Sequence, residues 1–206
     1  MSSALENSGE KIEVKRGRVR KTNLLGSSTK EKILDSYRSL IRERHTADVS
    51  LDDICHHADV KKGTLLYHFG SKEELQKIIV EQYVEHLEER YQAGIAVAVK
   101  KWPNHAPAVA GFVEWYRAYW HVKDPLYSAY GVAVLSLSAG NETLTAPVNR
   151  WYESVFARIR EESANDRHAL VAVLALEGLF FLGHFRVNVL ASDELNAVLD
   201  DLLVLS

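Results

Sequence analysis

The sequence is poor in cysteine and has no long hydrophobic run, and each shortage excludes a class of structure. Cys55 is the single cysteine among 206 residues, so neither an internal disulfide nor a C-x-x-C zinc or redox motif can form. The longest apolar run, around residues 171–176, is far shorter than the ~20 residues of a membrane-crossing helix, and the N-terminus lacks the apolar segment of a secretory signal. We therefore expect a cytoplasmic protein with no membrane partner.

Catalytic and metal-binding motifs are also missing. The chain contains no G-x-S-x-G, H-E-x-x-H, P-loop or dinucleotide fingerprint. His56 and His57 are adjacent, so on a helix they point to different faces and are poorly placed to share a metal. We expect no enzyme activity, no cofactor and no metal site.

Charge is distributed unevenly along the chain. Residues 1–77 hold 15 basic and 12 acidic residues, a net charge of +3, whereas residues 78–206 hold 10 basic and 16 acidic residues, a net charge of −6. Within the first part, residues 11–21 carry six basic residues against one acidic residue. This asymmetry indicates that the N-terminal end meets a polyanion while the rest of the chain has another task, although a basic tail can also serve solubility alone.

Hydrophobic spacing predicts helices almost throughout, hence an all-α fold. No segment alternates with a period of two, and no Asn-Gly or Asp-Gly hairpin signal occurs. From Thr29, which with Ser28 is a candidate N-cap, apolar residues recur at helical spacing to Arg44. Caps, prolines and glycines then divide the chain into about nine helices, over residues 29–44, 51–58, 60–69, 71–102, 106–122, 125–138, 141–163 (with Pro147 as a kink or true start), 166–190 and 192–205.

The second and third predicted helices have the form of a helix-turn-helix, in which the second helix of the pair enters the major groove of DNA. If Val60, Leu65 and Phe69 are buried, the remaining side chains of this helix point outward and can donate hydrogen bonds to phosphates or base edges. Gly63 permits close approach of the backbone, and Lys72 at the next helix start can reach a phosphate. The outward set is Lys61, Lys62, Thr64, Tyr67 and His68.

The stretch from Asp59 to Leu75, DVKKGTLLYHFGSKEEL, resembles the signature of the tetracycline-repressor (TetR) family of transcription regulators, and residues 30–34 resemble the start of that family's first helix. The resemblance covers residues 29–77. It implies an all-helical homodimer with an N-terminal three-helix DNA-binding domain and a C-terminal domain for ligand binding and dimerisation. It also implies base or phosphate contacts at Lys62, Gly63, Thr64, Tyr67, His68 and Lys72, with Ser50 near a phosphate.

Three positions depart from the family pattern, and one of them is Leu66, which occupies a position often held by tyrosine. Asp59 occupies the turn and His45 the end of the first helix, where the family commonly has glycine. The resulting organisation is a basic, flexible arm over residues 1–28, a DNA-binding domain over 29–77 and an effector-binding and dimerisation domain over 78–206. The expected function is a ligand-responsive regulator, by family default a repressor, that binds a palindromic operator and is released by a small molecule.

The arm contains an Arg-Gly-Arg centre at Arg16 and Arg18. Arginines of this kind insert into narrow minor grooves, where the negative potential is enhanced. The alternative is a tail that makes no contact with DNA, and the sequence does not separate the two.

The C-terminal part is rich in aromatic residues at helical spacing, which are typical of a helical core and also of a small-molecule cavity. Glu177 and His184 lie nearly on one face of an otherwise apolar helix, and a buried carboxylate needs a partner. We rank a structural salt bridge first for Glu177 and a ligand contact second. The candidate effector residues are Trp115, Arg117, Tyr119, Tyr127, Trp151, Glu177, Phe181 and His184.

The last two predicted helices favour self-association. The helix over residues 166–190 is apolar on all sides and contains small residues that allow close approach, and the helix over 192–205 carries a continuous apolar stripe. Two such helices from each chain would form a four-helix interface about a two-fold axis. Burial within one chain is the alternative.

Two functions from other classes stay open at this point. One is a helical-bundle binding protein whose basic segment contacts a protein or a membrane surface. The other is a small-molecule enzyme that uses Glu177 and His184 as acid and base. Salt-dependent, sequence-selective binding to a palindrome distinguishes the regulator from both.

Overall fold

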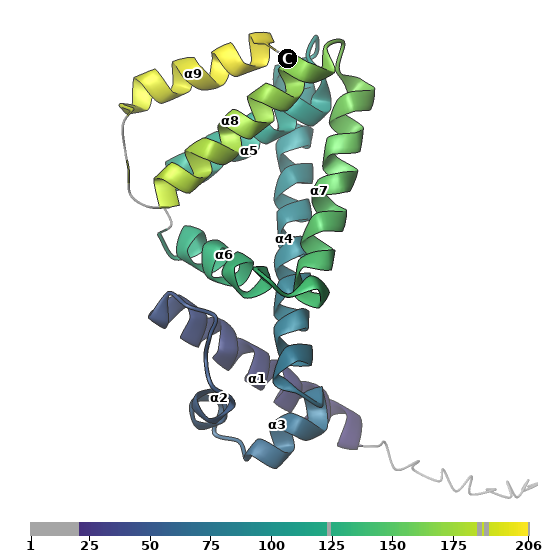
Figure 1. Cartoon of the computed structure of the whole chain (residues 1–206), viewed down its shortest axis with the longest axis vertical. Coiled ribbons are helices and arrows are strands. Elements are labelled where there is room, and N and C mark those ends of the chain that lie inside the picture. The colour runs from purple at the N-terminus through teal and green to yellow at the C-terminus, as the bar shows by residue number, and fades with distance from the viewer. Residues whose placement is uncertain (1–20, 123–124, 185–186, 188–189, 206) are drawn as a thin grey trace, which may run out of the picture.

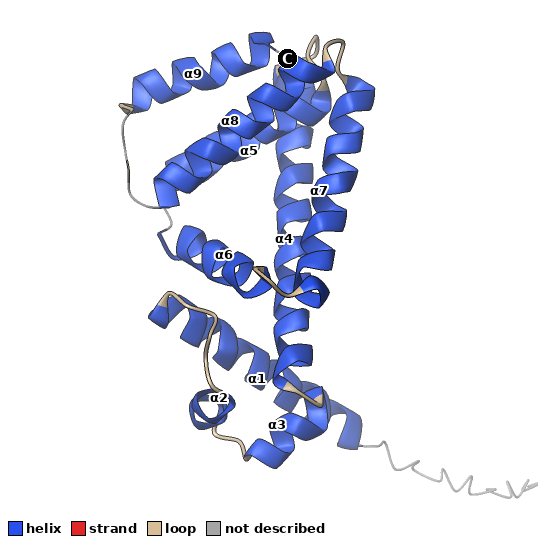
Figure 2. Cartoon of the chain, in the orientation of Figure 1, coloured by secondary structure: helices blue, strands red, loops and turns tan. Residues whose placement is uncertain are grey.

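The computed structural model describes residues 21–122, 125–184, 187 and 190–205, and these residues form nine helices and no strand (Figure 2). The all-α prediction is therefore confirmed. None of the described helices is long and apolar enough to cross a membrane. The helices are α1 (Lys21–Arg44), α2 (Leu51–Ala58), α3 (Lys62–Phe69), α4 (Lys72–Lys101), α5 (Pro107–Val122), α6 (Pro125–Ser138), α7 (Glu142–Glu162), α8 (Asp166–His184) and α9 (Ser192–Leu205).

Helices α1, α2 and α3 pack together at one end of the molecule, beside the first turns of α4 (Figure 1). The apolar stripe predicted for α1 is buried, with Ile33 and Ile41 fully inaccessible, and it packs on the buried side chains of α2 and α3. The Tyr37 hydroxyl donates a hydrogen bond of 2.7 Å to the carbonyl of Ala47. This bond anchors the loop that leads into α2.

Helix α4 connects this end to the rest of the chain, where α5 and α7 pack along it (Figure 1). The crossing of α4 and α5 is close because Gly94 and Gly111 face each other. A Cβ at Gly94 would collide with the backbone carbonyl of Gly111, and a Cβ at Gly111 would collide with Ile95. The two glycines therefore fix how α5 lies on α4, and with it the position of the aromatic side chains of α5.

Two helix boundaries differ from the sequence predictions by more than two residues, the start of α1 and the end of α8. Helix α1 begins at Lys21 and not at Thr29, so residues 21–28 of the predicted arm are helical. Serine and threonine are only mildly unfavourable inside helices, and the single Gly26 before them does not interrupt the helix. Helix α8 ends at His184 and not near Leu190, because the apolar run continues past that end and its glycines, Gly178 and Gly183, both lie inside the helix. Pro147 lies inside α7, which Asn141 caps by accepting a bond from the amide of Leu144.

Candidate nucleic-acid interface and candidate effector cavity

The turn between α2 and α3 is set by local capping. The Ser50 side chain accepts a hydrogen bond of 3.1 Å from the amide of Asp53, which starts α2 as predicted. Asp59 ends α2 in the left-handed conformation, with φ of 49°, and His45 takes the same region after α1, with φ of 53°. Aspartate tolerates this region better than most residues other than glycine and asparagine. The two residues at family glycine positions thus adopt the backbone conformation that glycine provides there.

One face of α3 is buried and the opposite face is open. Leu65 and Phe69 are buried and Val60 packs beside them, as the sequence analysis predicts. Lys61, Lys62, Gly63 and Tyr67 are exposed, and Thr64 and His68 are half-buried. Tyr67 is 85% exposed and lies edge-on to the His68 ring. The open face thus combines an exposed aromatic ring with exposed hydrogen-bond donors at Lys61 and Lys62.

Two lysines near this surface form ion pairs with aspartates of the N-terminal part of the chain. The Lys62 ammonium lies 3.0 Å from a carboxylate oxygen of Asp52, and the Lys72 ammonium lies 2.9 Å from Asp48. Both aspartates are exposed, so each pair contributes between about 0 and 1 kcal/mol to folding. A phosphate can displace such a partner at small cost.

Ser50 serves mainly as a cap in the free protein. Its hydroxyl also donates a bond of 2.6 Å to the carboxylate of Asp53, and the Arg44 guanidinium lies 3.0 Å from the same carboxylate. The bonds from Arg44 and then from Ser50 hold the pKa of Asp53 well below its usual range. The Ser50 hydroxyl thus lies at the N-terminus of α2, with its proton directed to Asp53 and not to solvent.

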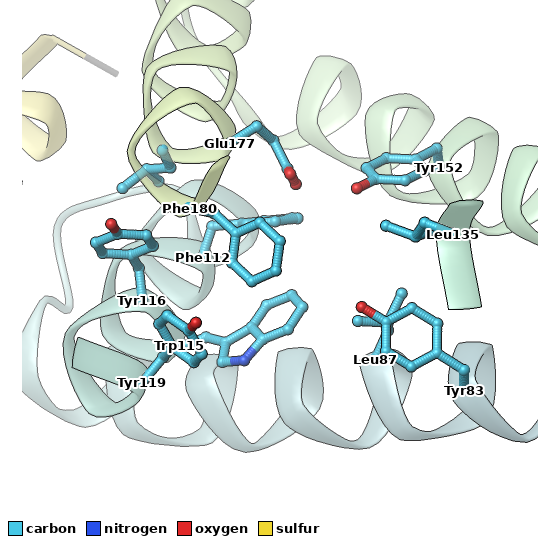
Figure 3. Close-up of a pocket in the computed structure, with 11 residues that line it drawn as sticks. Tyr83, Leu87, Phe112, Trp115, Tyr116, Tyr119, Leu135, Tyr152, Glu177 and Phe180 are labelled. Carbon is cyan, nitrogen blue, oxygen red and sulfur yellow. The ribbon is translucent and has the colours of Figure 1, made fainter. Parts of the chain in front are cut away.

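A pocket that is partly open to solvent lies in the C-terminal part, among α4, α5, α6, α7 and α8, and we call it the cavity (Figure 3). Its walls are aromatic and aliphatic apart from a few hydroxyls and one carboxylate, which belongs to Glu177. The lining residues are Tyr83, Leu87, Phe112, Trp115, Tyr116, Tyr119, Leu135, Tyr152, Leu176, Glu177 and Phe180. This composition is that of a site for a small, largely apolar molecule.

Glu177 is the polar centre of the cavity. Its carboxylate and the Tyr152 hydroxyl extend toward each other (Figure 3), and the hydroxyl donates a hydrogen bond to the carboxylate. Burial raises the pKa of Glu177 to about 7, and the bond from Tyr152 opposes that rise. Among the side chains that the structure describes, none is a cation paired with Glu177. The salt bridge that we ranked first is therefore not formed with any of them.

Only some of the predicted effector residues line the cavity. Trp115, Tyr119 and Glu177 line the cavity. Arg117 instead binds Asp200 and Asn196 of α9, each at 2.6 Å, and Trp151 is buried behind the wall, where its indole donates a bond of 2.8 Å to Glu88. The side chains of Tyr127 and His184, and the whole of Arg16 and Arg18, lie outside the described residues, and Phe181 is 43% exposed on α8.

Sequence reasoning missed the contribution of α4 to the cavity. Tyr83 and Leu87 line it, one turn apart on a helix of which the sequence analysis assigned a role only to Lys72. The four-residue spacing of Leu75, Ile79, Tyr83 and Leu87 places these residues on one stripe of α4. That stripe was visible in the sequence, but which helices face it was not.

Helix α8 keeps an apolar face open to solvent. Val171 and Leu174 are 57% and 60% exposed, and Phe181 and Leu182 continue the same face two turns further on. Gly178 lies between them, and a Cβ placed there would meet nothing within 4 Å. The predicted burial of α8 on nearly every side is therefore incomplete within one chain. We call Val171, Leu174, Gly178, Phe181 and Leu182 the α8 face.

The three-helix unit with an open α3 face, joined by α4 to a helical body that encloses a cavity, defines a class: two-domain transcription regulators with a helix-turn-helix. Two family models agree with this class. The model for bacterial regulatory proteins of the tetR family matches residues 33–77, and the model for a tetracyclin repressor-like C-terminal domain matches residues 113–206. The chain belongs to the TetR family of DNA-binding transcriptional regulators.

Solved structures support the fold. A transcriptional regulator of Streptomyces coelicolor A3(2) is 17% identical with a TM-score of 0.65, the alignment covering 86% of this chain and 98% of the other. A TetR-family member from S. coelicolor A3 is 17% identical with a TM-score of 0.64, covering 85% and 98%. The multidrug binding protein EbrR, complexed with imidazole, is 18% identical with a TM-score of 0.63, covering 86% and 89%. No curated protein sequence matches this chain.

Proposed function

We propose that this regulator is a repressor that binds a palindromic operator as a homodimer and leaves it when a small molecule occupies the cavity. The observation that carries the proposal is the open face of α3, with Tyr67 85% exposed between lysines on a helix whose other side is buried. Such a face supplies the donors that phosphates and base edges accept. We assign residues 29–77 to DNA binding and 78–206 to effector binding and dimerisation.

We assign a DNA contact to each residue of the proposed interface. Lys61, Lys62 and Lys72 contact phosphates, together with the hydroxyl of Ser50. Thr64, Tyr67 and His68 contact base edges or phosphates. At Gly63, a Cβ would meet nothing within 4 Å in the chain itself, so the glycine is not required by internal packing and is free to admit a DNA backbone. Arg16 and Arg18 extend the interface into an adjacent minor groove.

Selection of bound fragments from random duplex DNA tests this proposal and yields the half-site spacing. We expect an inverted repeat with half-sites about one helical turn, ~34 Å, apart. On that duplex, Lys62→Ala should weaken binding and reduce the slope of log affinity against log salt by about 1. Lys100→Ala, which removes an exposed lysine near the far end of α4, is the matched control. Equal losses in both variants, or no enriched sequence, would contradict the proposal.

The α8 face supports the homodimer. A two-fold axis through this face would bury apolar side chains that water otherwise contacts, and Gly178 would allow two helices to approach closely. Gly178→Arg tests the idea without disturbing one chain, because the position is open and arginine favours a helix over glycine by about 1 kcal/mol. We expect weaker dimerisation by analytical ultracentrifugation and unchanged helix content by circular dichroism. An unaltered dimer would place the interface elsewhere.

Contacts between the two parts of the chain support the effector response. Tyr83 of α4 lines the cavity and packs against Tyr130 of α6, and the Arg42 guanidinium of α1 lies 5.1 Å from the centre of the Tyr130 ring. A ligand can shift DNA affinity only through its different affinity for the two states. Arg42→Ala should therefore reduce the change in operator affinity that an effector causes. A full response in this variant would exclude Arg42 from the coupling.

A further inference from the structure

The walls of the cavity have a specific chemistry. Aromatic rings reach it from four helices, with Tyr83 from α4, Trp115 and Tyr119 from α5, Tyr152 from α7 and Phe180 from α8. Trp115 and Tyr83 lie on the opposite side of the cavity from the Glu177 carboxylate (Figure 3). The faces of such rings carry partial negative charge and attract cations within about 6 Å.

The single acid of the cavity lacks a cationic partner in the described protein. No lysine, arginine or histidine is among the lining residues, and the hydrogen-bond partner of Glu177 is the neutral Tyr152 hydroxyl. A carboxylate in such a place is costly to ionise, and burial accordingly raises its pKa to about 7. A positive charge brought by a ligand would supply what the described residues do not.

We infer that the cavity binds a lipophilic organic cation, whose positive charge lies between the Glu177 carboxylate and the aromatic rings on the opposite wall. This inference rests on the proposed role of the cavity as the effector site. It names the chemical class of the effector: a small aromatic or aliphatic ammonium compound.

The binding of such a cation depends on pH through Glu177. Among the described residues, the titratable groups that line the cavity with it are phenols: Tyr83 from α4, Tyr116 and Tyr119 from α5, and Tyr152 from α7, while α6 contributes Leu135. Burial raises the pKa of Tyr116 and Tyr152 above the ordinary value for tyrosine, so these two stay neutral near pH 7. Raising the pH through 7 ionises Glu177, and cation binding should strengthen.

Two molecules that differ in one atom test the inference directly. Phenyltrimethylammonium carries a permanent positive charge, and tert-butylbenzene has the same shape with carbon in place of nitrogen. Isothermal titration of the full chain with each molecule at pH 6 and pH 8 measures the contribution of the charge. We expect the ammonium ion to bind more tightly than the hydrocarbon and to gain about tenfold in affinity over this range, since Glu177 goes from mostly protonated to mostly ionised.

Variants assign the effect to the carboxylate. Glu177→Gln should lower the affinity for phenyltrimethylammonium at pH 8 by about tenfold or more and abolish its pH dependence, with tert-butylbenzene little affected. Tyr152→Phe keeps the ring but removes the donor to Glu177, so the pH dependence should move to higher pH. Glu153→Gln removes an exposed carboxylate from the neighbouring position on α7. It should change neither the affinity for phenyltrimethylammonium nor the pH dependence of that affinity.

The outcomes separate this inference from the proposed function. If tert-butylbenzene binds as tightly as the ammonium ion, the cavity remains an effector site and the cationic class is wrong. If Glu153→Gln weakens ammonium binding as much as Glu177→Gln, the charge acts at long range and the inference also fails. If neither molecule binds, the inference falls together with the ligand site, whereas the operator selection still tests DNA binding by itself.

Discussion

Replacing Glu177 by glutamine should stabilise the free protein at pH 8. The pKa of this carboxyl is about 7 in the folded chain and 4.5 in its ordinary state. The folded state therefore holds a proton that the unfolded state has lost between these two values, and stability falls as the pH rises through this window. One pKa unit corresponds to about 1.4 kcal/mol, so ionised Glu177 costs up to about 3 kcal/mol at pH 8 and less than about 1 kcal/mol at pH 5.

Urea unfolding of wild type, Glu177→Gln and Glu153→Gln at pH 5 and pH 8 measures this cost. The protein concentration must be the same throughout, because dimerisation adds to apparent stability. We expect Glu177→Gln to exceed wild type by about 1 to 3 kcal/mol at pH 8 and by much less at pH 5, with the Glu153 variant close to wild type at both. A Glu177 variant that is less stable than wild type at pH 8 would refute the reasoning, since it would show that the ionised carboxylate is well paired in the free protein.

Three further predictions concern the fold and the interface. Gly94→Ala should lower the free energy of unfolding by about 1 to 3 kcal/mol in a denaturant titration, because the added methyl meets the backbone of Gly111; an unchanged midpoint would mean that the helices separate freely. Asp59→Gly should raise the free energy of unfolding by about 0.5 to 1 kcal/mol by relieving the left-handed turn, and a loss would show that the aspartate side chain matters more than the turn. Asp52→Asn should tighten DNA binding in a filter or anisotropy assay, because Lys62 then has no ion pair with Asp52 to give up before it contacts a phosphate. Weaker binding would contradict the proposed role of the Lys62–Asp52 pair.

The helices could be predicted from the sequence because their signals are local. Ser50, Ser71 and Asn141 cap helices through their own side chains, and the stripe of α1 is buried as its spacing indicates. The start of α1 could not be predicted, because the candidate caps Ser28 and Thr29 lie inside the helix. The end of α8 could not be predicted, because Gly178 and Gly183 lie within the helix and do not single out one end. Tertiary packing decides such ends, and packing is not encoded in a window of a few residues.

The candidate sites show the same division. The open face of α3 could be predicted because Leu65 and Phe69 lie one turn apart, on one side of a single helix, and polar residues occupy the other side. Leu65 and Phe69 are buried, as predicted. The cavity depends on how five helices pack, so composition alone grouped Trp151 with Trp115, although one is buried behind the wall and the other lines the cavity. Only the arrangement in space distinguishes an aromatic residue of the core from one that lines a site.

The central claim is that the open face of α3 meets duplex DNA. A photoreactive phenylalanine analogue at position 67, irradiated in complex with the selected duplex, tests this contact directly, with the same analogue at the exposed Val99 of α4 as control. We predict a covalent adduct with the DNA from position 67 and none from position 99. A tight complex that gives no adduct from position 67, or equal adducts from both positions, would contradict the account.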